Sequence, residues 1–238
     1  MSPSLNPIKT IKILISIIIF LLCMNIMGIT SKFYLDHDYV YGLIPLFDFD
    51  TEFNIPSLFS TILLISSSTL LFNITLKHKK NNNLYNSWAI LSIIFLYLSM
   101  DELLSIHEMI EDPIRELFNI SDVLYYAWVI PYGLLLVLFV ASYMKFLIRL
   151  PNKTSTLMLV SGSIFVTGAL GFELLEARLA TNVGINNILY SIYYTIEETL
   201  EMSGITLFIY TLLTYTINQF YSSSETDTSK PSISINKT

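Results

Sequence analysis

NILYSIYYTIEETLEMSGITLFIYTLL, residues 187–213, is an apolar segment that carries three glutamates, Glu197, Glu198 and Glu201. A helix of about 20 apolar residues crosses a hydrocarbon core of about 30 Å, so the segment predicts a membrane-spanning helix. A charged side chain in the middle of a bilayer costs about 2.5–3.5 kcal/mol on insertion scales. We therefore expect these glutamates to face a bundle interior, a partner or a water-filled site.

The rest of the chain has the same apolar character. Of its 238 residues, 53% are hydrophobic and 13% are charged, which excludes an ordinary soluble domain. Apolar runs of spanning length lie near residues 11–30, 57–76, 86–108, 123–147, 156–177 and 190–216. They lack the period-two alternation of barrel strands, and lipid-exposed backbone must then be helical. We predict an all-α integral membrane bundle of six transmembrane helices within residues 1–220.

The first run has the basic start of a secretory signal, because Lys9 and Lys12 precede it. Its uncharged stretch continues to Ser31, however, and no small-x-small cleavage site lies near its end. We expect it to remain as the first membrane helix. The single cysteine, Cys23, lies in this run and excludes both an internal disulfide framework and a cysteine-based metal site.

The basic residues predict how the helices are oriented. Eight of them flank the ends that would share one side of the membrane: Lys9, Lys12, Lys77, Lys79, Lys80, Lys145, Arg149 and Lys153. The opposite side has Lys32, Arg115 and Arg178. By the positive-inside rule the first side is cytoplasmic, so both termini are predicted to lie in the cytoplasm. The predicted location of the protein is the inner (plasma) membrane. Residues 221–238 are polar and serine-rich and predict a disordered cytoplasmic tail.

The segment after the first run, residues 31–57, is the longest one expected on the outer side. It mixes aromatic residues with five acids, Asp36, Asp38, Asp48, Asp50 and Glu52. Aromatic side chains suit the membrane interface. We expect this segment to lie over the outer mouth of the bundle.

The third run ends in SMDELLSIHEMIEDPIRELF, residues 99–118. On a continuous helix, Asp101 and Glu108 lie within about 20° of each other, with Ser105 between them on the same face. His107 adds an imidazole to the carboxylates of this helix end. Such a set can bind a divalent metal or relay protons.

Small residues in the fifth run predict close approach to neighbouring helices. They are Ser161, Gly162, Gly168, Ala169 and Gly171. Close approach would bring the following acids, Glu173 and Glu176, toward carboxylates of other helices. Arg178 is the cation nearest to them in the sequence, and it either neutralises one of them or extends to the outer interface.

The sixth run places Tyr190, Tyr194, Glu197 and Glu201 on one helical stripe, with Glu198 beside it. Three acids within five residues, with apolar sequence on both sides, are hard to explain as a hydrated helix end. This cluster is the strongest prediction of a functional site in the chain.

Hard oxygen ligands together with one histidine favour iron, manganese or, less well, zinc as a divalent metal. The Glu-x-x-His spacing of ferritin-like bundles and the histidine-rich signature of membrane desaturases are both absent. His78 is expected to be a plain cytoplasmic surface residue. The predicted metal ligands are Asp101, His107, Glu108, Glu173, Glu197 and Glu201. Further site candidates are Glu102, Ser105, Glu176, Glu198 and Tyr194.

Three stretches together resemble an uncharacterised group of bacterial multi-pass membrane proteins. They are FDFDTEFNIPSLFS (residues 47–60), FLYLSMDELLSIHE (residues 95–108) and EETLEMSG (residues 197–204). The resemblance extends over most of residues 40–212. It implies a six-helix membrane architecture with acids and histidine in these places, and it implies no activity.

Three hypotheses of function follow from these residues. The first is a metal-dependent membrane enzyme that acts on a lipid or another amphiphile. The second is a transporter of a divalent cation or of protons, although the inner half of the bundle lacks acids and so favours a one-sided site. The third is a noncatalytic protein that binds a membrane partner subunit. In each case the lipid bilayer is a partner and nucleic acid is not.

Overall fold

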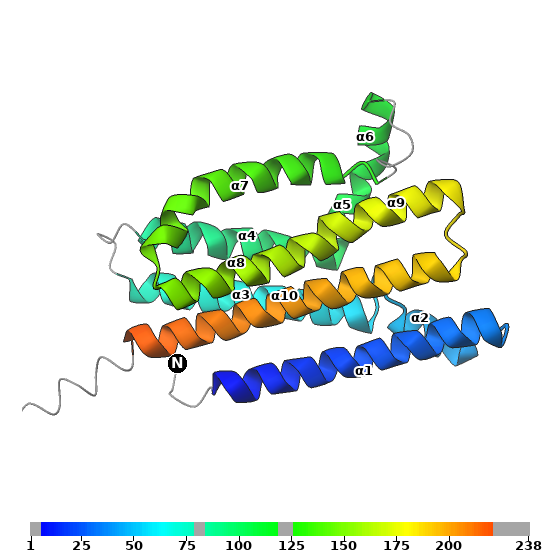
Figure 1. Cartoon of the computed structure of the whole chain (residues 1–238), viewed down its shortest axis with the longest axis horizontal. Helices are drawn as coiled ribbons and strands as arrows, with labels where there is room; N and C mark the ends of the chain where they lie inside the picture. Colours follow the sequence, from blue (N-terminus) through cyan, green and yellow to red (C-terminus); the bar gives the residue numbers. More distant parts are fainter. Residues whose placement is uncertain (1–5, 79–83, 119–125, 221–238) are drawn as a thin grey trace, which may run out of the picture.

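The computed structural model describes residues 6–78, 84–118 and 126–220, and every regular element within them is helical (Figure 1). The elements are α1 (Pro7–Tyr34), η1 (Val40–Gly42), α2 (Leu43–Phe47), α3 (Ile55–Lys77), α4 (Tyr85–Leu104), α5 (Ile106–Met109), α6 (Glu111–Phe118), α7 (Val129–Arg149), α8 (Asn152–Val166), η3 (Thr167–Phe172), α9 (Glu173–Asn182) and α10 (Ile188–Phe220). The predicted tail, residues 221–238, lies outside the described residues, as do residues 123–125 of the fourth apolar run.

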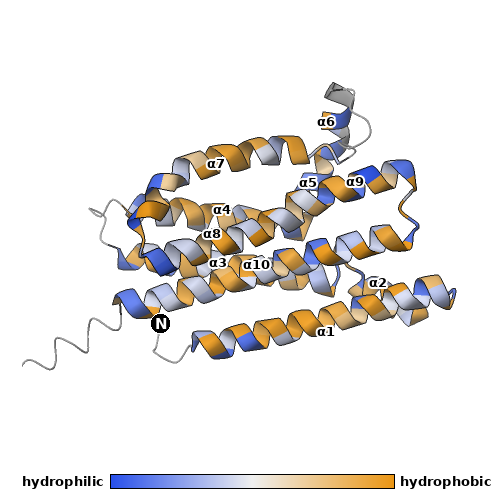
Figure 2. Cartoon of the chain, in the orientation of Figure 1, coloured by the Kyte–Doolittle hydropathy of each residue, from blue (hydrophilic) through white to orange (hydrophobic). Residues whose placement is uncertain are grey.

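Six of the described helices are long and apolar enough to cross a membrane, which agrees with the six predicted runs. They are α1, α3, α4, α7, the continuous α8–η3–α9 segment, and α10. The most apolar residues follow the long helices, while hydrophilic residues collect at α5, α6 and α9 (Figure 2). The fold therefore has the form of a multi-pass membrane bundle.

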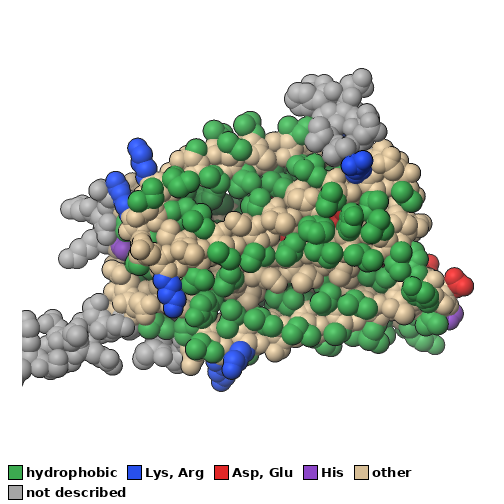
Figure 3. Space-filling model, in the orientation of Figure 1, with side chains coloured by type: hydrophobic (Ala, Val, Ile, Leu, Met, Phe, Trp, Pro, Cys, Tyr) green, Lys and Arg blue, Asp and Glu red, His purple; other side chains and the backbone are tan. Residues whose placement is uncertain are grey.

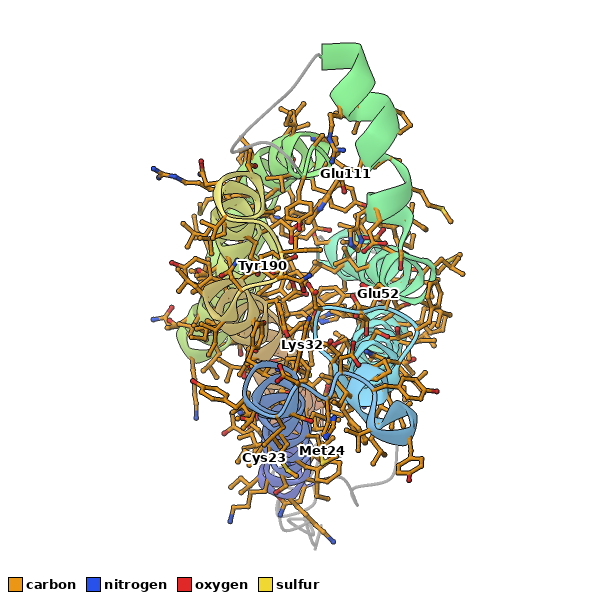
Figure 4. The ribbon with its side chains drawn as sticks, turned by 90° about the vertical axis from the view of Figure 1, so that its right-hand side faces the viewer. Cys23, Met24, Lys32, Glu52, Glu111 and Tyr190 are labelled. Atoms are coloured by element: carbon orange, nitrogen blue, oxygen red, sulfur yellow. The ribbon has the colours of Figure 1, made fainter. Side chains whose placement is uncertain are left out.

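The helix α10 is the centre of this bundle. It packs against α1, α3, α8, η3 and α9, and α3 in turn packs against α4. In the end view of Figure 4 the helices form two rows, with α1, α10 and α9 on one side and α3 and α4 on the other. Within the apolar windows of α3 and α10, 61% of residues are buried, compared with 17% in α1 and α7. The interior of the bundle is therefore built around α3 and α10.

Local sequence fixes where the first two long helices begin. Asn6 caps α1 by accepting a hydrogen bond from the Ile8 backbone N–H at 2.9 Å. Asn54 and Ser57 form a reciprocal capping box at the start of α3, in which each side chain accepts from the backbone of the other. Such caps satisfy N–H groups that have no partner within the helix. The segment between α1 and α3, residues 35–54, which we call the outer loop after its predicted location, is thereby anchored directly to the start of α3.

Close packing between α8 and α10 depends on small residues. A Cβ built on Gly204 would lie 2.8 Å from the Phe165 backbone nitrogen, and one on Gly168 would lie 2.8 Å from the Glu197 carbonyl oxygen. Ser161 is also buried here, as the sequence predicts. Gly162 and Gly171 are exposed instead, so their predicted part in helix packing is wrong. Of the predicted small residues, Ser161 and Gly168 therefore lie at the contact with α10, whereas Gly162 and Gly171 do not.

The two ends of the described chain lie at the same end of the bundle, where α1 begins and α10 finishes (Figure 1). Most of the visible Lys and Arg side chains lie toward that end (Figure 3). The same uneven distribution of Lys and Arg in the sequence is the basis for the predicted orientation in the membrane. The side of the membrane on which this end lies remains a prediction.

The third predicted helix, residues 86–108, is interrupted. Ser105 adopts left-handed backbone angles, φ 49° and ψ 46°, so α4 ends at Leu104 and the short α5 follows. A non-glycine residue rarely adopts this conformation. The expectation that Asp101, Ser105 and Glu108 share the face of a continuous helix is therefore wrong, because the chain changes direction between them.

His78 is buried, with 8% of its surface exposed, so the prediction of a plain surface residue is wrong. Its ring stacks with Trp88 and Tyr215, and its Nε2 lies 3.1 Å from the Tyr215 hydroxyl. The residue follows the last residue of α3 and is flanked by lysines, a pattern typical of a hydrated helix end. Aromatic side chains of other helices enclose it instead.

Replacing Gly204 with alanine should destabilise the protein, because the new methyl group meets the backbone of α8 and has no flexible side chain to displace. Overpacking of this kind costs about 1–3 kcal/mol. Gly162→Ala is the matched control, since nothing lies within 4 Å of its Cβ position. Thermal unfolding in detergent should show a lower Tm for Gly204→Ala and an equal or higher Tm for Gly162→Ala. Equal melting of Gly204→Ala and the wild type would contradict the close packing.

Burial lowers the pKa of His78 below its ordinary value of 6.5. The folded state therefore favours the neutral imidazole. The free energy of unfolding has its full value above pH 6.5 and decreases as the pH falls below 6.5, because the unfolded state then binds a proton more readily. We expect the Tm to decrease on acidification, and to decrease less in a His78→Gln variant. His37→Gln serves as the control because His37 is exposed. The same pH profile in His78→Gln and the wild type would rule out this contribution.

Candidate functional site

Acids from three separate parts of the chain meet at the bundle end opposite the described termini. The helix α4 supplies Asp101 and Glu102, α9 supplies Glu173 and Glu176, and α10 supplies Glu197, Glu198 and Glu201. Glu102 interacts electrostatically with both Glu198 and Glu201, and Glu201 also interacts with Glu173. The structure thus brings the acid-bearing helices together, a point that the sequence leaves open.

A π-helical turn, η3, leads directly into the acidic part of α9. Wider turns of this type occur often at functional sites. The contact at Gly168 places this turn against the backbone of Glu197 and within 3.0 Å of the Glu201 Cγ atom, measured from an ideal Cβ position. The turn therefore holds Glu173, the next residue after it, beside the glutamates of α10.

Asp101 is 6% exposed and is held by donors from two elements. Its Oδ1 accepts from the His107 backbone N–H at 2.9 Å and from the Tyr132 hydroxyl at 3.0 Å. The His107 Nδ1 lies 3.4 Å from Asp101 Oδ2. Tyr97 extends this network, with its hydroxyl 2.8 Å from that of Tyr132. Asp101 thus fixes the position of His107 after the break at Ser105.

The pKa of His107 reflects opposing effects. Burial lowers it, but the hydrogen bond and the charge of Asp101 raise it, as does the charge of Glu173, and the net result is a raised pKa. The negative surroundings therefore favour a positive charge at this position. A proton on the imidazole supplies that charge, and so would a cation bound to it.

Three side chains at the mouth of the bundle form what we call the rim triad: Glu52, His107 and Glu108. One potential ligand atom from each lies within 4.8 Å of the other two. Glu52 belongs to the outer loop, and its Oε2 is buried without a hydrogen-bond partner in the described part of the chain. Burial raises the pKa of Glu52 to about 7; the charges of Glu108 and Asp101 add to this rise and that of His107 opposes it.

Glu52 is predicted in the loop over the mouth, but it is not among the predicted ligands. The available signal is its position between aromatic residues, in FDFDTEF, just before the cap of α3. Only the folded loop turns this carboxylate toward α5 (Figure 4).

A second group, which we call the inner triad, consists of Glu173, Glu176 and Glu197. The Glu197 carboxyl hydrogen-bonds with those of both Glu173 and Glu176. Trp128 donates a hydrogen bond from Nε1 to Glu173 Oε1 at 3.1 Å, and its ring also contacts His107. Glu176 is 3% exposed, and its Oε1 has no partner among the described residues. Glu176 and Glu197 of the inner triad are therefore buried, Glu173 is half-buried, and one carboxylate oxygen lacks a described partner.

The remaining predicted site residues lie around these two groups. Tyr194 is buried, and Ser105 is buried with no described hydrogen-bond partner for its Oγ. Glu198 interacts electrostatically with Glu52 and His107, and one of its carboxylate oxygens is also buried without a described partner. Because Glu198 also interacts electrostatically with Glu173 and Glu176, it connects the rim triad to the inner triad.

No lysine or arginine within the described residues forms an ion pair with either triad. The described ion pairs are His107 with Asp101 and Arg115 with Glu111. Arg178 is exposed, which fits extension to a membrane interface better than neutralisation of a buried acid. The buried carboxylates consequently depend on protons or on a bound cation for charge compensation.

Asn25, Trp128 and Tyr132 position the site and are absent from the predicted set. Asn25 is 2% exposed in α1; its Nδ2 donates to Thr195 Oγ1 at 2.8 Å, and its Oδ1 accepts from the Phe49 N–H at 3.1 Å. A single amide within the apolar run LLCMNIMG is a signal that the sequence does contain. The other two residues carry no comparable signal, because aromatic residues are common at membrane interfaces.

The fold and the site define a class: a helical protein with six helices of membrane-spanning character and an acidic, histidine-containing site at one end. Residues 13–216 match the family described as Domain of unknown function (DUF8692), and the chain belongs to that family. No curated protein and no solved structure matches the chain. The family match agrees with the resemblance to an uncharacterised group and gives no source organism.

Replacing Asn25 with leucine should loosen the outer loop, because the Phe49 N–H and the Thr195 hydroxyl both lose their contact with it. A buried polar group left without its partner costs about 1–3 kcal/mol. Asn73→Leu is the matched control, since Asn73 lies on an exposed face and bonds to its own helix. Hydrogen exchange should become faster in residues 47–52 of Asn25→Leu alone. Unchanged exchange would show that the amide does not anchor the loop.

Proposed function

We propose that this protein is a metal-dependent membrane enzyme whose rim triad binds a divalent transition metal. The observation that carries this proposal is the convergence of Glu52, His107 and Glu108, with one ligand atom of each within 4.8 Å of the others. Metal–ligand bonds of about 2.0–2.2 Å allow two ligands to be at most about 4.4 Å apart. Small rotations of the two glutamate side chains would therefore complete the site.

The donor set indicates the kind of metal. One imidazole nitrogen with carboxylate oxygens suits zinc, iron or manganese. Asp101 faces Nδ1 of His107, which leaves Nε2 for the metal, and a carboxylate in this second position orients a histidine ligand. In this proposal Asp101 is a positioning residue, while His107 and Glu108 keep their predicted roles as ligands.

Three protein ligands leave a coordination position for water or substrate. A metal in this site would supply a nucleophilic hydroxide for hydrolysis or, if it is iron, a centre for oxidation. The outer loop that carries Glu52 also carries exposed aromatic side chains, Tyr39, Tyr41 and Phe53, which suit an amphiphilic substrate. A lipid could lie between these aromatic residues with its polar group near the rim triad.

The distribution of Lys and Arg favours a cytoplasmic location for both termini, and the rim triad then faces the non-cytoplasmic side of the plasma membrane. The substrate would accordingly reach the site from the outer leaflet or from the external medium.

Elemental analysis of the purified protein tests the metal site. We expect a stoichiometric transition metal in the wild type and its loss in His107→Ala and in Glu52→Gln. His37→Ala is the control, because His37 is an exposed histidine of the same loop region. Metal retained in both rim variants, or no metal in any sample, would sink the proposal. Incubation with lipid extracts, followed by mass spectrometry of wild type against His107→Ala, would then identify the substrate.

A second candidate function, cation or proton transport, is favoured by one observation. Buried hydroxyl groups continue along the interior away from the acids: Ser60, Ser67, Ser68, Thr75, Ser92, Thr206, Thr211 and Thr216. The buried His78 lies at their far end. Metal or proton flux into proteoliposomes decides between the two functions. Flux equal to that of protein-free vesicles would exclude transport.

A further inference from the structure

We infer that a small cavity between the start of α8 and the end of α10 binds the phosphate group of an anionic phospholipid. The cavity lies at the bundle end that holds the described termini, opposite the rim triad, so this inference goes beyond the proposed function and does not depend on it (Figure 1). Its volume is about 70 Å³. One water molecule needs about 10–15 Å³ of such space, so a compact polar group fits inside.

The residues that line the cavity suit an anion. Its polar lining residues include Lys153, Thr154, Thr211, Thr214, Asn218 and Gln219, and none of the described lining residues is acidic. Thr154 and Thr211 are buried, whereas Lys153 and Asn218 are exposed, so the cavity opens to the surface beside the lysine. An ammonium group and several hydroxyl and amide donors therefore surround one small space.

The first turn of α8 adds backbone donors at the same place. Its N-cap residue is Pro151, and no side chain caps the helix within the described residues. The Ser155 N–H donates to the Pro151 carbonyl at 3.0 Å, so the N–H groups of residues 152–154 have no partner within the helix. Lys153 and Thr154 belong to this turn and line the cavity. The positive end of the helix dipole thus favours an anion in it.

An unpartnered oxygen on the facing helix points to a ligand independently of the start of α8. Thr214 lines the cavity, and its Oγ1 is buried without a hydrogen-bond partner among the described residues. The neighbouring Thr211 hydroxyl, in contrast, donates to the Leu207 carbonyl at 2.8 Å. Leaving a buried hydroxyl without a partner is unfavourable. A phosphate oxygen in the cavity would accept the hydrogen bond that Thr214 does not make.

The position of the cavity in the bundle indicates a lipid as the source of the phosphate. Its lining residues lie at the ends of two membrane-spanning helices, the level at which the headgroups of a bilayer lie. Two more cations, Lys145 and Arg149, lie in the last turns of α7, which leads directly into α8. The distribution of Lys and Arg predicts that this end is cytoplasmic, and basic pockets between helices on that side bind anionic headgroups.

Native mass spectrometry of the full-length protein, titrated with phosphatidylglycerol in a mild detergent, tests the inference. The wild type should retain the lipid, and Lys153→Gln and Thr214→Val should each bind it about tenfold more weakly, because each loses a hydrogen bond to the phosphate. Lys145→Gln is the control for charge, since Lys145 does not line the cavity. Thr216→Val is the control for the hydroxyl, because Thr216 Oγ1 is also buried and unpartnered but lies outside the cavity.

Both controls should bind the lipid as the wild type does. Wild-type affinity in both cavity variants would overturn the inference, and so would an equal loss of binding in Lys145→Gln and Lys153→Gln, because the lipid would then respond to charge at this end of the bundle and not to the cavity.

A thermal measurement separates a lipid from a free anion and from poor folding. Melting without lipid shows whether each variant folds. Short-chain phosphatidylglycerol should raise the Tm of the wild type and of Thr216→Val, and raise that of Thr214→Val less, while phosphatidylcholine of the same chain length should have no effect. Stabilisation by inorganic phosphate equal to that by the lipid would overturn the assignment to a lipid. Absence of any shift with phosphatidylglycerol in the wild type would overturn the site itself.

Discussion

Repulsion among carboxylates that share a poorly hydrated volume is the constraint on which the rest of this structure depends. Acids from α4, α9 and α10 lose much of their contact with water when the helices pack, and the described lysines and arginines are not paired with the two triads. Burial of uncompensated charge is costly unless protons, hydrogen bonds or cations offset it. The surrounding structure accordingly supplies donors at fixed positions.

Each of these donors also joins elements that are distant in the sequence. Tyr132 of α7 bonds to Asp101 of α4, and the indole of Trp128, the residue that precedes α7, bonds to Glu173. Asn25 links α1 to α10 and to the outer loop at once. The polar interactions of the site therefore contribute to the assembly of the bundle, and a change in one of them affects both stability and function.

The resulting site has an outer and an inner part with different properties. The rim triad is partly accessible, contains the histidine and includes a loop residue. The inner triad is largely buried, contains only acids and is carried by α9 and α10, which lie close together beside Gly168. This division places the accessible rim triad, where we propose that a metal binds, next to a largely buried acidic cluster.

The sequence by itself determined the helical membrane class, the approximate limits of the long helices and the identity of most acids at the site. Run length and hydropathy are local properties, and an acid in an apolar run has a high cost wherever the helix packs. Helical periodicity failed at Ser105, and the topology-based prediction failed at His78, because a left-handed residue and an aromatic enclosure depend on contacts with other elements. Only the tertiary structure decided that Glu52 joins His107 and Glu108, and that Glu197 bridges Glu173 and Glu176. Contacts between separate elements depend on how the helices and the loop pack in three dimensions, which hydropathy and spacing along the chain do not specify.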